Sequence, residues 1–173
     1  MDAENSKPRL KQQIESLRSS NRTAILSTLK DLRSDGDVSV LSELFQLLLV
    51  QEDREIQDEI AALLNDLKDQ EAVVELADAI VNPEYQEIQS ILVAACWQNG
   101  LSYGKHISAF VEVLISGEYA AAIEAFTVIE ESIGELEQVE RKKLASSMKS
   151  QLRAMGEQKK ALLLELVKVI ESY

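Results

Sequence analysis

Histidine and cysteine, which serve most often in metal binding and nucleophilic catalysis, occur once each in this chain, and their spacing assigns neither of them such a role. His106 is the only histidine and Cys96 the only cysteine. A metal site built on histidine needs further ligands at suitable spacing, and His106 has no cysteine or aspartate close to it in sequence. Cys96 lies in an apolar helical stripe, where a buried structural thiol is the usual outcome. We prefer that interpretation to a Cys-His nucleophile pair.

The glycines and carboxylates do not form a recognisable site either. Gly100 and Gly104 flank Asn99 and Ser102 in a connector, but no Lys-Ser pair follows them, as a phosphate-binding loop requires. Acidic residues are so abundant that pairs arise anywhere, and their presence carries little information. We therefore predict no catalytic residues, no metal and no cofactor, and a function other than that of an enzyme.

The formal net charge of −12 is distributed unevenly along the chain. Residues 1–34 hold seven basic and four acidic residues, residues 35–140 hold three and 23, and residues 141–173 hold eight and three. The acidic middle would repel phosphate backbones, so we expect no nucleic-acid binding, and a basic peptide or protein is the more natural partner. The alternative is that the acids only keep outer helix faces soluble.

Composition favours one folded, largely helical domain covering residues 1–173. The chain is 46% apolar, with two prolines and six glycines, and its length can bury a substantial core. Its first residues contain no apolar run, and the longest apolar stretches, 47–50 and 162–164, are too short to cross a bilayer. We expect a cytoplasmic protein without a membrane segment, and a single cysteine fits a reducing compartment.

Apolar residues recur at helical spacing between regularly placed turn signals, which predicts ten helices. The first is expected over residues 8–19, because Pro8 suits a first helical position, and the ninth over about residues 135–155. The capping signals are Asn21, Asp53, Asp69 and Asn82-Pro83-Glu84 at helix starts, and Asp35-Gly36-Asp37 and Gly100 at helix ends.

These helices make about five antiparallel pairs, and the turns within the pairs recur at a nearly constant interval. They fall near residues 20, 52, 82, 117 and 156. A pair of this kind cannot bury its apolar stripe alone, so neighbouring pairs must stack. We predict residues 1–34 as an N-terminal cap, 35–134 as central acidic repeats and 135–173 as a long C-terminal hairpin cap.

A short phrase marks the repeat: Glu55-Ile56-Gln57 returns 32 residues later as Glu87-Ile88-Gln89. With the small residues of Ile60-Ala61-Ala62-Leu63-Leu64-Asn65 and Leu92-Val93-Ala94-Ala95-Cys96, these phrases resemble the second helices of HEAT-like, armadillo-like repeats. The resemblance implies an all-α, right-handed α-α superhelix whose second helices line a concave surface. Family repeats often carry an arginine of a polar inter-repeat ladder where Gln57 and Gln89 stand, and this chain differs there.

Aligning the two phrases places Trp97 at the position of Asn65, on an inferred polar face. We predict that a partner binds there, on Asp58, Glu59, Asn65, Gln89 and Trp97. In the alternative, which the frequent burial of tryptophan favours, Trp97 fills a gap beneath the 99–104 connector and its indole bonds to the backbone. Tyr85, Tyr103 and Tyr119 are interpreted as surface packing residues.

The function that we predict is a non-catalytic scaffold that binds a protein or peptide on the concave face of the stack. The alternative is a small enzyme or enzyme accessory, similar to a lyase or a DNA glycosylase, that uses the same concavity as a pocket. The acidic centre argues against a glycosylase, which needs a basic groove. The oligomeric state is left open, because the last two helices could also pair between chains.

Overall fold

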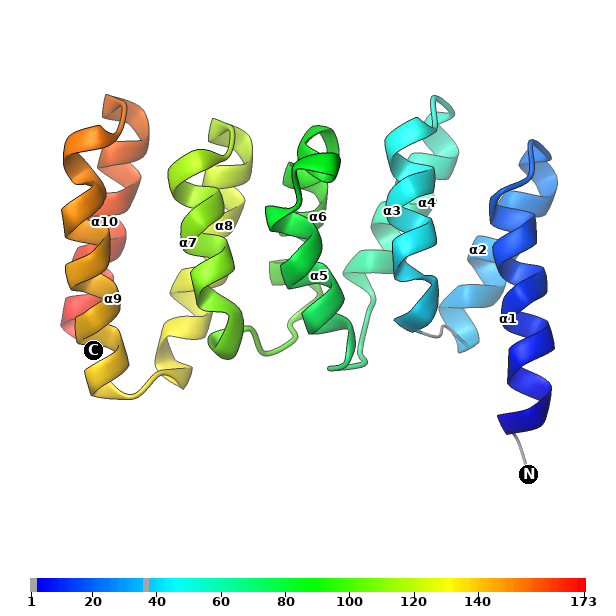
Figure 1. Cartoon of the computed structure of the whole chain (residues 1–173), viewed down its shortest axis with the longest axis horizontal. Helices are drawn as coiled ribbons and strands as arrows, with labels where there is room; N and C mark the ends of the chain where they lie inside the picture. Colours follow the sequence, from blue (N-terminus) through cyan, green and yellow to red (C-terminus); the bar gives the residue numbers. More distant parts are fainter. Residues whose placement is uncertain (1–2, 36–37) are drawn as a thin grey trace.

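The computed structural model describes residues 3–35 and 38–173, and these form ten α-helices and no β-strand. The helices stand side by side as five pairs, which confirms the all-α prediction and the pairing (Figure 1). The first helices of the pairs are α1 (Ala3–Leu17), α3 (Leu41–Val50), α5 (Ala72–Val81), α7 (Ile107–Ser116) and α9 (Gln138–Gln151). The second helices are α2 (Arg22–Asp35), α4 (Arg54–Asn65), α6 (Gln89–Asn99), α8 (Tyr119–Ser132) and α10 (Glu157–Ser172).

The first helices form one layer and the second helices form another (Figure 1). Within the second layer, α2 packs on α4, α4 on α6, α6 on α8 and α8 on α10. The turns within the pairs lie along one edge of the molecule, and the connectors between pairs lie along the opposite edge. Packing therefore runs within each pair and between neighbouring pairs, as in a repeat protein.

Several helix ends follow the predicted capping signals. The Asp53 carboxylate accepts hydrogen bonds from the backbone N–H groups of Glu55, at 3.0 Å, and Ile56, at 3.3 Å. The Asn21 side chain accepts from the N–H of Ala24. Gly100 ends α6 with a φ of 67°, the left-handed conformation that glycine adopts at least cost. The predicted stop at Asp35-Gly36-Asp37 includes residues 36 and 37, which lie outside the described residues.

Other boundaries differ from the prediction. The Asn82 side chain does accept from the N–H of Glu84, but the segment that begins there is a 3₁₀ helix, η2 (Pro83–Ile88). Tyr85 interrupts it with non-helical angles and packs edge-to-face on Phe45, at 5.7 Å between ring centroids. The α-helix therefore starts only at Gln89, because burying Tyr85 overrides the local start signal.

The first and ninth helices also differ from their predicted ranges. Helix α1 begins at Ala3, so Pro8 lies inside it rather than at its first position. Helix α9 is shorter than expected because 3₁₀ turns flank it, η4 (Ile133–Glu135) before it and η5 (Leu152–Ala154) after it. The remaining short elements are η1 (Val38–Val40) and η3 (Gly104–His106).

The connector edge is held together by polar contacts between residues about one repeat apart. The Gln70 side chain donates to the carbonyl oxygen of Ser102, at 2.7 Å, and accepts from its N–H, at 3.1 Å. Glu135 then accepts from the Ser102 hydroxyl and from the N–H of Gly104. These residues are 32 and 33 positions apart, so one polar row joins three successive connectors.

Candidate functional site

The position of Trp97 decides between the two interpretations of this residue. Its side chain is 38% exposed on α6. The indole N–H donates to Oε2 of Glu124 on α8, at 2.6 Å, and not to a backbone carbonyl. The alternative in which Trp97 fills the space beneath the connector is therefore wrong, because the indole has a carboxylate partner on the neighbouring second helix.

Tyr103 occupies the space beneath the connector instead. Its side chain is 1% exposed and packs edge-to-face on Phe110, with ring centroids 5.2 Å apart. Its hydroxyl group is hydrogen-bonded to the buried side chain of Asn99. Tyr85 is buried as well, and only Tyr119 keeps the surface position predicted for all three tyrosines. A buried tyrosine needs a partner for its hydroxyl group, which Asn99 supplies to Tyr103 and Gln46 to Tyr85.

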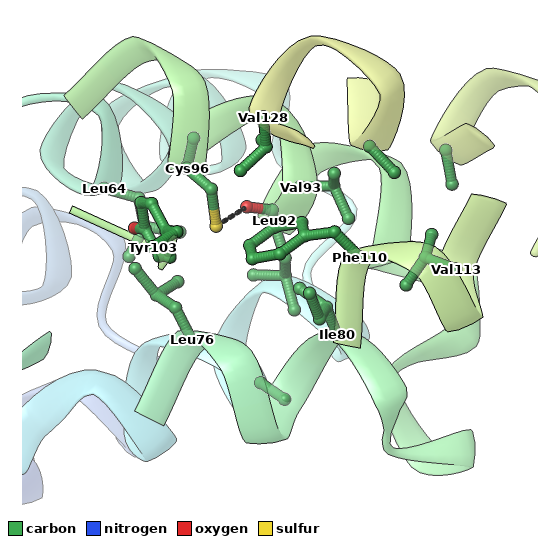
Figure 2. Close-up of a cluster of buried hydrophobic side chains, with 14 of the residues drawn as sticks. Leu64, Leu76, Ile80, Leu92, Val93, Cys96, Tyr103, Phe110, Val113 and Val128 are labelled. Carbon is green, nitrogen blue, oxygen red and sulfur yellow. Dashed lines mark hydrogen bonds between the residues drawn. The ribbon is translucent and has the colours of Figure 1, made fainter. Parts of the chain in front are cut away.

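Cys96 lies in the core beside Tyr103, as the sequence predicted (Figure 2). Its thiol donates to the carbonyl oxygen of Leu92, at 3.2 Å. Burial raises the pKa of this thiol to about 12, which keeps it protonated at neutral pH. Burial likewise raises the pKa of Tyr103. A thiol in this environment is unreactive, so Cys96 has a structural role.

Asp58 and Asn65 belong to the same outer layer as Trp97. Asp58 is exposed on α4, and Asn65 is half-buried and donates to the side chain of Gln98 on α6, at 3.0 Å. Asn65 therefore contacts the residue next to Trp97 in sequence. These two residues, with Trp97 and Glu124, extend over three successive second helices.

Glu59 is turned away from this group, toward α2. Its Oε2 atom lies 3.5 Å from a terminal nitrogen of Arg33, and that oxygen is buried without a hydrogen-bond partner. Its side chain is 29% exposed. Glu59 thus links α4 to α2, and its carboxylate lies between these two helices.

Gln89 is engaged within its own pair. Its side-chain N–H donates to the carbonyl oxygen of Ile80 near the end of α5, at 2.7 Å. Gln57 does the same in the preceding pair, donating to the carbonyl oxygen of Gln51 after α3, at 2.6 Å. The recurrent glutamines therefore tie each second helix to the end of its first helix, where the resemblance had suggested contacts between repeats.

The structure thus divides the five predicted binding residues. It places Asp58, Asn65 and Trp97 on the solvent-accessible side of the second helices, which we call the outer face. Glu59 instead pairs with Arg33 on α2, and Gln89 bonds to the first helix of its own pair. It adds Glu124, which the sequence did not single out, because nothing local shows that Glu124 meets an indole 27 positions earlier. We call Asp58, Asn65, Trp97 and Glu124 the outer-face group.

Two surface cavities lie around α9. One, of about 680 Å³, is lined by Glu135 and Glu140 together with Lys105 and Lys143. Both carboxylates have structural partners, Glu135 in the connector row and Glu140 at the N–H of Glu137 before α9. The other, of about 430 Å³, lies between α9 and α10 and is lined by Arg141, Lys142 and Lys149, among others. Its Arg141 is held by two backbone carbonyls and its Lys149 by Glu171.

Comparison with protein-family models and with curated proteins finds no match to this chain. The resemblance to HEAT-like repeats therefore rests on the sequence pattern, and membership of that family stays a prediction. Among residues 3–35 and 38–173, no helix is long and apolar enough to cross a membrane. In the same residues, no three His, Cys, Asp or Glu side chains gather closely enough to hold a metal ion.

Proposed function

We propose that this protein is a non-catalytic scaffold that binds a basic protein or peptide segment on the outer face of α4, α6 and α8. The observation that supports this proposal most directly is that Trp97 is exposed and hydrogen-bonded to Glu124. Both residues belong to the strongly acidic segment 35–140. Exposed tryptophans on an otherwise polar face are common anchors of protein interfaces. The acidic surroundings would steer a basic partner toward it.

We also propose a shape for the stack of five helix pairs. The second helices contact one another in sequence order, and the polar contacts between connectors span about one repeat. Both features support a stack of repeats. We propose that this stack is a right-handed, HEAT-like superhelix whose concave side is the outer face of the second helices. A solution scattering profile that departs from a curved rod of five pairs would contradict this shape.

The binding proposal is tested with a paired set of variants of the full chain. The face variant carries Trp97→Ala and Asp58→Lys, which remove the anchor and reverse one exposed charge. The control variant carries Val74→Ala and Asp78→Lys on α5, where an exposed apolar and an exposed acidic residue lie in the other layer. Glu59 is left unchanged, because a lysine there would face Arg33 and confound binding with stability.

The measurement is capture of peptides from a random-sequence library by the immobilised protein. We expect the wild type and the control variant to select the same basic sequences, and the face variant to lose them while keeping its helicity and a cooperative unfolding transition. Full capture by a folded face variant would refute the proposal. So would an equal loss in the control variant, since the site would then lie elsewhere.

A further inference from the structure

The hydrogen bond to Glu124 determines how Trp97 can contact a partner. Because the indole N–H already donates to Oε2 of Glu124, at 2.6 Å, it is not free to donate to a ligand. The same bond fixes the orientation of the ring between α6 and α8. The exposed part of Trp97 that remains for recognition is therefore its apolar and π surface, which favours cations.

Glu124 places a negative charge at the edge of that ring. A carboxylate has about four acceptor positions on its two oxygens, and the indole uses one of them. Glu124 is only half-buried, so the remaining positions can be reached from solvent. A cation lying over Trp97 would meet a π face and a carboxylate together.

We infer that Trp97 and Glu124 form a recognition site for an arginine side chain of a basic partner segment. The guanidinium group stacks on the indole and donates to the free acceptor positions of Glu124. Arginine fits better than lysine because its planar, weakly hydrated group can stack and donate in one geometry. The inference rests on the proposed function, since it specifies the ligand chemistry of the same face.

In this arrangement Glu124 both orients the indole and pairs with the cation, and two substitutions separate these roles. Glu124→Gln keeps an oxygen that accepts from the indole but removes the charge. Glu124→Ala removes both. We therefore expect Glu124→Gln to keep the slow hydrogen exchange of the bonded indole N–H and to weaken arginine binding, whereas Glu124→Ala loses both.

The experiment uses the full chain and three blocked peptides in which glycine alternates with arginine, lysine or citrulline. Because Trp97 is the only tryptophan, its fluorescence reports binding at this site directly. We expect the arginine peptide to change the fluorescence and to bind about fivefold more tightly than the lysine peptide, and the citrulline peptide not to bind. Glu124→Gln should reduce arginine binding to the lysine level. The matched control Glu112→Gln, at an exposed position on α7, should have no effect.

The outcomes separate this inference from the proposed function. Equal binding of arginine and lysine peptides with unchanged fluorescence would overturn the arginine site and show only general attraction to an acidic surface. Selection of uncharged library peptides that is lost with Trp97→Ala would also overturn it, while upholding the binding face. Failure of the face variant to affect any capture would refute the proposed function itself.

Discussion

Trp97 and Tyr103 are six residues apart, yet one is an exposed side chain on the second-helix layer and the other is the centre of the connector edge. Tyr103 is surrounded by the core and by residues that contact one another across connectors. Trp97 has one polar partner and a free ring surface. Contacts along the connector edge therefore hold successive repeats together, and the outer face of the second helices is available to a ligand. This difference predicts opposite responses to mutation in the two regions.

The largest effect is expected from truncating the two aromatic residues. Tyr103→Ala should lower the free energy of unfolding by about 3–5 kcal/mol, because it opens a cavity in the core and leaves Asn99 without its hydroxyl partner. Trp97→Ala should cost less, about 2 kcal/mol, since 38% of the residue is already exposed and its hydrogen bond to Glu124 is exposed as well. Urea denaturation followed by circular dichroism measures both. Equal losses would remove the distinction between the two regions.

Alkaline pH should lower the stability of the core around Cys96. The thiol of Cys96 keeps its proton in the folded state up to a pKa of about 12, compared with an ordinary value of 9.0. Unfolding between these pH values releases that proton, so the stability contributed by the protonated thiol is complete below pH 9.0 and decreases as pH rises. The expected decrease is about 1 kcal/mol per pH unit from this group.

Denaturation curves measured across this pH range test the alkaline effect. The variant Cys96→Ala lacks the titrating thiol and should show a shallower decrease with pH. The wild type and this variant would show the same slope if the buried thiol made no contribution.

A smaller loss is expected at Gly104, where the side chain of Glu135 lies against the backbone of the neighbouring connector. A Cβ atom there would lie 2.6 Å from Oε2 and 2.8 Å from Cβ of Glu135, so Gly104→Ala should cost about 1–3 kcal/mol. Gly156→Ala is the matched control, because nothing lies within 4 Å of the added atom and no positive φ is required. It should be neutral or slightly stabilising.

A double-mutant cycle tests the cause of the loss at Gly104. Gly104→Ala and Glu135→Gly should be less than additive, because Glu135→Gly removes both the Cβ atom and the carboxylate that the added methyl group would meet. If the two free-energy changes were strictly additive, the loss at Gly104 would not come from a steric clash with Glu135.

The smallest effect is expected at the edge of the outer-face group. Asn65→Ala should change the free energy of unfolding by about 0.5 kcal/mol or less, because its bond to Gln98 is exposed and both groups can bond to water. The same substitution should weaken peptide capture if Asn65 belongs to the binding face. Thermal unfolding and the library assay, run on one preparation, measure both quantities.

Much of the fold follows from local signals in the sequence. The turns near residues 20, 52, 117 and 156 and the caps at Asn21, Asp53 and Gly100 are readable because each depends on the backbone groups of a few neighbouring residues. The signal at Asn82-Pro83-Glu84 misplaces the start of α6, because Tyr85 packs on a residue 40 positions away. A long-range contact of that kind leaves no trace in a local pattern.

The candidate site was predictable only in part. Repeat alignment places Trp97, Asn65 and Asp58 in one layer, since residues one period apart occupy equivalent positions. It could not find Glu124, and it could not separate Gln89 from the outer face, because the direction of each side chain depends on partners in other helices. The choice between an exposed and a buried Trp97 depended on the same kind of information.

The helical character of the chain, its repeat of about 32 residues and its acidic middle can all be predicted from the sequence, because periodicity, caps and charge are local or additive properties. The folded structure is needed to show that Tyr103 rather than Trp97 fills the space beneath the connector, and that a carboxylate from α8 holds the indole at the surface. Which aromatic side chain is buried depends on which helices become neighbours and on the space between them. That space is created only when the helices pack together.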